Sequence, residues 1–437
     1  MGFWMALALV MGSMIGSGVF LLPASLAPLG WNSVFGWVLT IAGALSMAAV
    51  FAALAKAYPH AGGPYAYTRL AFGAVPAFAV AWAYWMSIVV GNAAIATAAV
   101  SYLSRLFPAI GAPGLSGLVS VAIIWLFTLI NIRGAGLSGR VQVVSVILKL
   151  IPLIAVIGLA AFVLLRDGVS VVAPFESSAI SVGGITAAGT LTLWAMLGIE
   201  TATVPAGSVR DPERTIPRAT MLGAASAGLI YLFVCSAIVL MMPAQITAKS
   251  AAPFADFVAF YVGSDAGLVL AGFGAISALG ALNGWVMVQA EMPLAMARDG
   301  LFPAAFGKLS ARGTPVVSHL VSSSLLSLVV LLNYTKSMAD LFQFLILMTT
   351  AIVLFVYFVC ALAAGSLLIK RQLPVTKPLV FCVAAGLIFS VWTMVGAGAE
   401  AVAYGLLLML AGIPIYFLSK LRREKAAAGI ADEEPVA

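Results

Sequence analysis

The chain has 437 residues, of which 63% are hydrophobic and only 8% are charged. Water-soluble domains carry about 25% charged residues, so this composition excludes a soluble globular protein and predicts a chain surrounded by lipid. The formal net charge of +7 does not require a nucleic-acid partner, because membrane proteins with many spans collect Lys and Arg in their cytoplasmic loops.

Apolar stretches long enough to cross a bilayer, roughly 20 residues each, recur about twelve times. We place them at 3–28, 33–57, 72–103, 115–132, 141–165, 186–207, 218–242, 258–297, 316–333, 340–369, 378–397 and 401–419. The first is longer than the apolar core of a cleavable signal peptide, and its centre is rich in glycine. The sequence therefore predicts an all-α polytopic membrane protein with about 12 transmembrane helices.

The distribution of basic residues predicts the orientation of these helices. If the N-terminus is cytoplasmic, most Lys and Arg residues fall at cytoplasmic helix ends and loops. The outer side then holds Arg105, Arg166, Lys249 and Lys336. This bias predicts that both termini are cytoplasmic. The tail at 424–437 is Ala-rich and acidic, and we expect it to be disordered.

Glycines interrupt the first span, where Gly16, Ser17 and Gly18 precede Pro23. This pattern predicts a short extended stretch between two half-helices. The free N–H groups at the start of a half-helix form an anion site, which suits a substrate carboxylate. The alternative is close packing of helices through small residues.

A second interruption lies in the sixth span, where Gly198 separates Trp194 from Glu200. Paired interruptions in the two halves of a chain are typical of a transporter's binding site. An acid near mid-membrane costs about 2.5–3.5 kcal/mol on insertion scales, so Glu200 is a functional candidate; the alternative is a structural carboxyl held by a hydroxyl. The Trp194 ring can stack on a cationic or planar substrate, or it can serve only for packing.

Lys149 is the one basic residue that falls well inside a predicted span. It can extend along the helix to the cytoplasmic surface. Alternatively, its ammonium points inward at the carbonyls of the broken first span, where sodium-coupled transporters hold a sodium ion. Asn92 is a polar residue and Trp285 an aromatic one within apolar runs, and each is a further candidate for the site.

The sequence gives no sign of enzymatic chemistry. It has no paired catalytic carboxylates, nucleophile motif or metal-ligand spacing, and its three cysteines all lie in apolar stretches. Such cysteines usually behave as small buried hydrophobes. We expect neither a cofactor nor a metal.

The chain resembles the amino acid–polyamine–organocation superfamily over nearly its whole length. Within that superfamily it is similar to the bacterial arginine–agmatine antiporters and their basic amino acid and polyamine relatives. The motifs that carry the resemblance are GSGVFLLP at 16–23, YPHAGGPYAY at 58–67, GN at 91–92, NIRG at 131–134, LWAMLGIE at 193–200 and RDGLFP at 298–303.

The resemblance implies a LeuT-type architecture. Residues 1–423 would form one transmembrane domain, with inverted repeats of five helices at 3–165 and 186–369 and two extra helices at 378–419. It also implies a bacterial inner-membrane location, and it is compatible with a homodimer.

The same resemblance implies a set of roles. The substrate carboxylate would bind Ser17 and Gly18, and its amino group the carbonyls of Met14, Trp194 and Leu197. Trp194 would form the middle gate, Trp285 would floor the pocket, and Glu200 with Tyr84 would form the distal gate. The substrate's distal end would meet Ser87, Ile88 and Asn92, with a hydroxyl near Thr349.

Two departures bear on the substrate. Ser13 stands where the arginine–agmatine antiporters have an Asn, and Lys149 resembles the fifth-span lysine of sodium-independent, proton-linked permeases. We therefore expect a sodium-independent antiporter of a small-molecule substrate, favouring cationic amino acids and their amines. The alternative is a proton-coupled permease for neutral amino acids, which the apolar Ile88 and Ile95 beside Asn92 favour.

Overall fold

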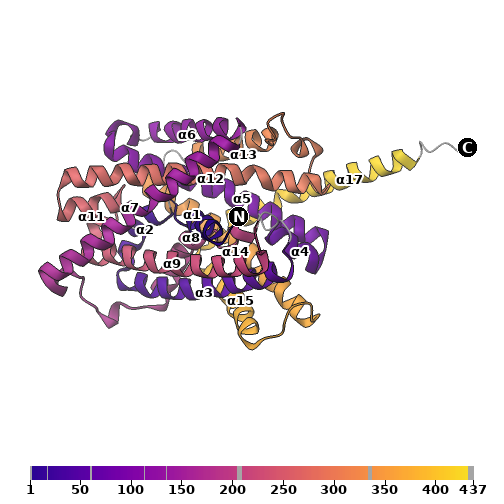
Figure 1. The fold of residues 1–437 in the computed structure, drawn as a ribbon. Coiled ribbons are helices and arrows are strands. Elements are labelled where there is room, and N and C mark those ends of the chain that lie inside the picture. Colours follow the sequence, from indigo (N-terminus) through magenta and orange to yellow (C-terminus); the bar gives the residue numbers. More distant parts are fainter. Residues whose placement is uncertain are drawn as a thin grey trace, which may run out of the picture.

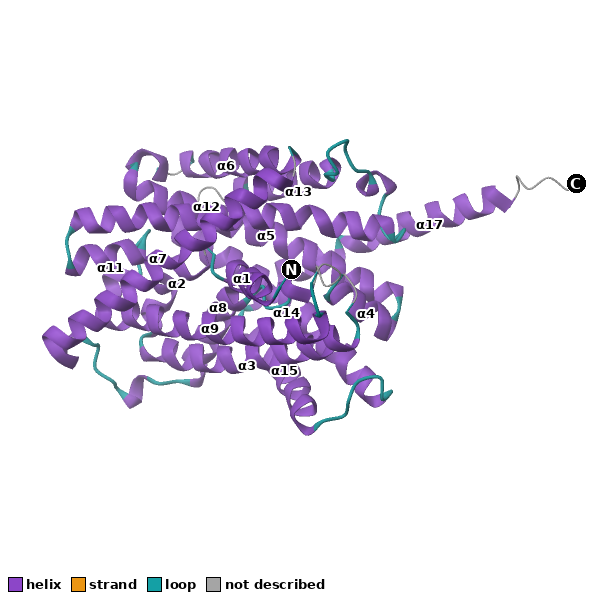
Figure 2. Ribbon diagram, in the orientation of Figure 1, coloured by secondary structure: helices purple, strands orange, loops and turns teal. Residues whose placement is uncertain are grey.

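The computed structural model describes residues 2–16, 18–59, 62–112, 114–133, 135–203, 209–332 and 337–431. Throughout these ranges the chain is built of helices and their connections, without a strand (Figure 2). Most of the helices run side by side along one direction (Figure 1). This all-helical architecture agrees with the prediction from composition.

The first half of the chain contributes two half-helices and a group of long helices. They are α1 (Phe3–Met14), α2 (Gly18–Leu26), α3 (Trp31–Ala57), α4 (Pro64–Phe72), α5 (Ala74–Leu106), α6 (Leu115–Ile132) and α7 (Ala135–Asp167). The short 3₁₀ helices of this half are η1 (Ala27–Leu29) and η2 (Pro108–Gly111).

The second half follows after two more 3₁₀ turns, η3 (Gly168–Val171) and η4 (Ser177–Ala179). Its elements are α8 (Val182–Met196), η5 (Thr201–Thr203), α9 (Pro212–Met241), α10 (Ala244–Thr247), α11 (Pro253–Tyr261), α12 (Ser264–Arg298), η7 (Ala304–Gly307), α13 (Val316–Leu331) and α14 (Met338–Ile369). The chain ends with α15 (Lys377–Gly396), α16 (Ala399–Leu410) and α17 (Gly412–Ala431).

Nine helices in the described part of the chain are long and apolar enough to cross a membrane. The pair α1 and α2, bent by 41°, makes a tenth if it counts as one broken span, and α8 and α13 are shorter apolar helices. These elements lie near the predicted positions, although 258–297 divides between α11 and α12, and 401–419 between α16 and α17. The number of twelve spans stays a prediction.

The centre of the bundle is α5, whose residues are buried almost without interruption from Ala77 to Tyr102. A helix that is apolar on every side is stable inside a protein core or against lipid. Here α12 and α14 pack against it along its length. Many of the buried residues are alanines, which let neighbouring backbones approach closely. This helix therefore supplies a fixed wall for whatever site the bundle encloses.

The outer helices carry large apolar side chains on the surface, among them Phe381, Ile388 and Val395 on α15. Such a surface is stable against lipid and not against water.

The last helix, α17, projects beyond the bundle (Figure 1). It continues through 424–431, where composition predicts disorder, because Ala, Lys, Glu and Arg all have high helix propensity; residues 432–437 lie outside the described part.

Candidate functional site

Both predicted helix interruptions are present. α1 ends at Met14 and Ile15 is extended, with ψ of 90°, before α2 begins at Gly18. α8 ends at Met196, and Leu197 is extended, with ψ of 146°. Gly198 follows with φ of +103°, a conformation open mainly to glycine. Each interruption leaves backbone N–H and C=O groups without helical partners.

The two interruptions face each other. A Cβ atom on Gly198 would lie 3.3 Å from the Cβ of Ser13, and one on Gly18 would lie only 2.8 Å from Nε1 of Trp194. The start of α2 therefore meets the Trp194 ring at a distance that only glycine permits. The glycine-rich sequence of both segments follows from this close approach.

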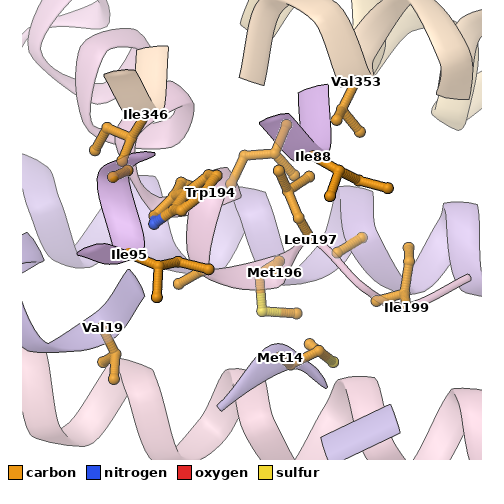
Figure 3. Packing of buried hydrophobic residues seen from close by; sticks show 14 of the residues in the cluster. Met14, Val19, Ile88, Ile95, Trp194, Met196, Leu197, Ile199, Ile346 and Val353 are labelled. Carbon is orange, nitrogen blue, oxygen red and sulfur yellow. The ribbon is translucent and has the colours of Figure 1, made fainter. Parts of the chain in front are cut away.

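A cavity lies between these interruptions and the helices α5, α12 and α14. Figure 3 shows Trp194 and Leu197 in the middle of this region, with Ile88 and Val353 above them and Met14 below. The lining residues are Ser13, Met14, Gly16, Gly18, Tyr84, Ser87, Ile88, Gly91, Asn92, Ile95, Trp194, Leu197, Glu200, Trp285, Thr349 and Val353.

The predicted site residues thus come together from five separate helices, with two exceptions. Ser17 lies outside the described residues, and Lys149 lies on α7, away from the cavity wall. Thr349, which the resemblance placed near the distal pocket, lines the cavity as well.

Glu200 is held by two tyrosines. Its carboxyl is buried, Oε1 accepts a hydrogen bond from the Tyr84 hydroxyl at 2.8 Å, and Oε2 accepts one from Tyr357 at 2.6 Å. The resemblance supplied Tyr84. Sequence reasoning missed Tyr357, because a tyrosine within the apolar run 340–369 carries no local sign of the direction in which it points.

Three polar atoms at the cavity have no hydrogen-bond partner among the described residues. They are Oδ1 of Asn92, Nε1 of Trp194 and Oγ1 of Thr349. Buried polar groups are almost always paired, and leaving one without a partner costs about 1–3 kcal/mol. These atoms mark positions where a bound molecule or water can supply the missing bond.

Lys149 points inward. Its side chain is only 1% exposed, and Nζ donates a hydrogen bond to the carbonyl oxygen of Gly12 at 3.0 Å. This contact confirms the prediction that the ammonium lies within hydrogen-bond reach of the first span. The alternative, in which the Lys149 side chain extends along the helix to the cytoplasmic surface, is wrong. The lysine therefore joins α7 to α1 two residues before α1 ends.

The described residues contain no group of three or more His, Cys, Asp or Glu side chains that could hold a metal ion. The cavity offers hydrogen-bonding and aromatic groups instead.

Comparison with known proteins decides the family. The model of the amino acid permease family matches residues 1–418. The chain belongs to the amino acid permease family. It is therefore a membrane transporter and not an enzyme, and the resemblance to the superfamily is confirmed.

Several permease relatives share much of their length with this chain. The cadaverine/lysine antiporter of Escherichia coli K12 is 35% identical over 352 residues, 78% of each chain. The putrescine transporter PotE of Haemophilus influenzae is 31% identical over 422 residues, 93% of this chain and 94% of its own. The PotE of Escherichia coli K12 is 30% identical over 424 residues, 95% of each chain.

Proposed function

We propose that this permease is a sodium-independent antiporter that exchanges cationic amino acids for one another or for their decarboxylated amines across a bacterial inner membrane. Twelve spans in two inverted repeats of five plus two extra helices, with both termini cytoplasmic, form its frame. Relatives named for lysine with cadaverine and for putrescine support this substrate class.

One feature carries the proposal. Both helix interruptions border a single cavity that also holds Trp194 and Asn92. The substrate carboxylate binds the N–H groups at Ser17 and Gly18, and the amino group binds carbonyls of Met14, Trp194 and Leu197. A half-helix N-terminus favours the negative group, and free carbonyls favour the positive one.

The distal end of the substrate lies between Ser87, Ile88 and Asn92, on the floor made by Trp285. Trp194 closes over the ligand as the middle gate. Glu200, held by Tyr84, is the gate beyond it and a group that exchanges protons. Movement of the broken helices against the fixed wall of α5 then exposes the cavity to each side in turn.

Lys149 takes the place of a coupling cation in this scheme. Its ammonium holds the Gly12 carbonyl at 3.0 Å, at the end of α1 that must move. A hydrogen-bond donor supplied by the chain at this point removes the need for a sodium ion. Transport is then independent of sodium.

A competition panel tests the substrate class. Proteoliposomes loaded with labelled lysine are exposed to each of the twenty amino acids, agmatine, putrescine and cadaverine, and release of label is measured. Ornithine is added to this panel. We expect the strongest release with lysine, arginine, ornithine and the three amines. Release by neutral amino acids alone would reject the cationic class.

The second candidate is a proton-coupled permease for neutral amino acids. Two observations favour it. Both Glu200 oxygens already accept hydrogen bonds from tyrosines, which leaves this acid less available to a cationic substrate. In addition, apolar walls are given to the cavity by Ile88, Ile95 and Val353. It predicts uptake of leucine-like or serine-like amino acids into empty vesicles when the outside is made acidic. The panel and this uptake assay separate the two functions.

A further inference from the structure

A chain of hydrogen bonds leads from Asn92 at the cavity to Thr128 on α6. Nδ2 of Asn92 donates to Oε1 of Gln289 at 2.8 Å, and Nε2 of Gln289 donates to Oγ of Ser323 at 3.1 Å. Ser323 lies 2.6 Å from Oγ1 of Thr128. All four side chains are buried, so water does not compete for these bonds.

The direction of every bond in this chain is fixed at its far end. Oγ1 of Thr128 lies 2.8 Å from the carbonyl oxygen of Ile124, and a carbonyl only accepts. The single hydroxyl hydrogen of Thr128 goes to that carbonyl. Thr128 must therefore accept from Ser323, whose own hydrogen is then used.

The two amides follow from this. The Ser323 oxygen can only accept from Gln289, so Gln289 turns its Nε2 toward α13 and its Oε1 toward Asn92. Asn92 must then present Nδ2 to Gln289. Its Oδ1 is the atom that remains, and it has no partner within the described part of the chain.

We propose that Gln289, oriented by Ser323 and Thr128, is a positioning residue that presents Asn92 to the cavity as a hydrogen-bond acceptor. The site then selects substrates whose distal end donates hydrogen bonds, such as an ammonium or a guanidinium, over apolar ends of the same size. This inference rests on the proposed function and extends its selectivity to three residues that do not line the described cavity.

The helices that carry these residues form one unit. Asn92 lies on α5, Thr128 on α6, Gln289 on α12 and Ser323 on α13. Each of these four helices packs against the other three. The orientation of the Asn92 amide is therefore fixed by a packed group of helices and does not depend on the broken segments.

Replacing Thr128 by Val tests the inference at its most distant point. Val fills nearly the same volume but accepts no hydrogen bond, so Ser323 turns its hydrogen to Gln289, and both amides reverse. Asn92 would then turn its Nδ2, a hydrogen-bond donor, toward the substrate. We expect the ratio of apparent affinities for lysine and norleucine, measured by competition in proteoliposomes, to fall at least about tenfold, the scale of a bond to a charged group.

Three further variants control this experiment. Thr97→Val makes the same change at a buried threonine of α5 whose hydroxyl also bonds a carbonyl one turn back, Ala93 at 2.9 Å, and it should leave the ratio unchanged. Thr128→Ser restores the hydroxyl and should restore the ratio. Ser323→Ala removes the next link and should lower the ratio even if Thr128→Val does not reach the membrane.

The outcomes separate the inference from the function. A wild type that exchanges lysine and amines, with an unchanged lysine-to-norleucine ratio in Thr128→Val or in Ser323→Ala, overturns the inference and leaves the proposed function standing. A wild type that exchanges no cationic substrate rejects the function itself. A fall of the ratio in both variants, with Thr97→Val unaffected, supports both.

Discussion

The Trp194 ring lines the cavity, where it faces the start of α2 and lies against Gly91. Leu in its place restores bulk but offers no aromatic face for a cation, an interaction of about 0.5–2 kcal/mol. We predict that Trp194→Leu loses transport while the protein still reaches the membrane, and that Trp194→Phe or Trp194→Tyr keeps part of it. Trp4→Leu, at a side chain 78% exposed, is the control. Exchange at the wild-type rate in Trp194→Leu would remove Trp194 from the gate.

Tyr357 is a residue that only the structure reveals. Removing its hydroxyl leaves one buried oxygen of Glu200 without its donor, at a cost of about 1–3 kcal/mol. We expect Tyr357→Phe to slow exchange by about tenfold, as measured by initial rates per reconstituted protein. Tyr231→Phe is the matched control, because the Tyr231 hydroxyl is buried and has no partner among the described residues. If both variants behave alike, the Tyr357–Glu200 bond has no part in transport.

Glu200 is the acid that lines the cavity within the described part of the chain. If it exchanges protons during transport, an amide in its place cannot follow the pH of the medium. Glu200→Gln should keep the fold, because its amide oxygen still accepts from one tyrosine, and should flatten the pH dependence of the transport rate between mildly acidic and neutral pH. A pH profile identical to that of the wild type would count against this role.

At the scale of elements, the interruption of α8 depends on one backbone conformation. Gly198 has φ of +103° and faces Ser13, so an alanine there meets both strain, about 1–3 kcal/mol, and a close contact. Gly198→Ala should therefore reduce the transport rate severalfold more than it reduces the amount of protein in the membrane. Gly183→Ala, near the start of α8 with open space around it, should have no such effect; equal losses in the two variants would mean that the interruption is not needed.

Lys149 connects two elements. Lys149→Met keeps most of the volume and removes the ammonium from the Gly12 carbonyl, leaving that carbonyl without its cation. We predict that transport of every substrate slows strongly and to the same degree, because the lysine contacts the helix break and not the cavity. Lys56→Ala, at an exposed lysine of α3, is the control. A change in selectivity, or near-normal exchange by Lys149→Met, would contradict this role.

The elements show how far sequence reasoning reaches. The two interruptions could be predicted because glycine clusters in apolar runs are local signals, and Lys149 stood out because charge is rare in a span. Tyr357 and Gln289 could not be predicted, since their importance depends on the rotation of α14 and α12 about their axes.

At the scale of the whole molecule, the bundle combines a fixed group of helices with two broken ones. The group formed by α5, α6, α12 and α13 is held by mutual packing and by the buried hydrogen bonds from Asn92 to Thr128. The broken helices make hydrogen bonds of their own, among them those from Lys149 to Gly12 and from Tyr102 to Phe20. In the proposed transport cycle the broken helices move while the group of four keeps the shape of the site.

The central claim is that this permease exchanges substrates without sodium, and counterflow measures it directly. Proteoliposomes loaded with labelled lysine in sodium-free buffer are diluted into medium with or without unlabelled lysine or cadaverine, and each condition is repeated with added sodium. We predict rapid release only when substrate is outside, at rates that sodium does not change. Release into empty medium at the same rate, or release that requires sodium, would contradict it.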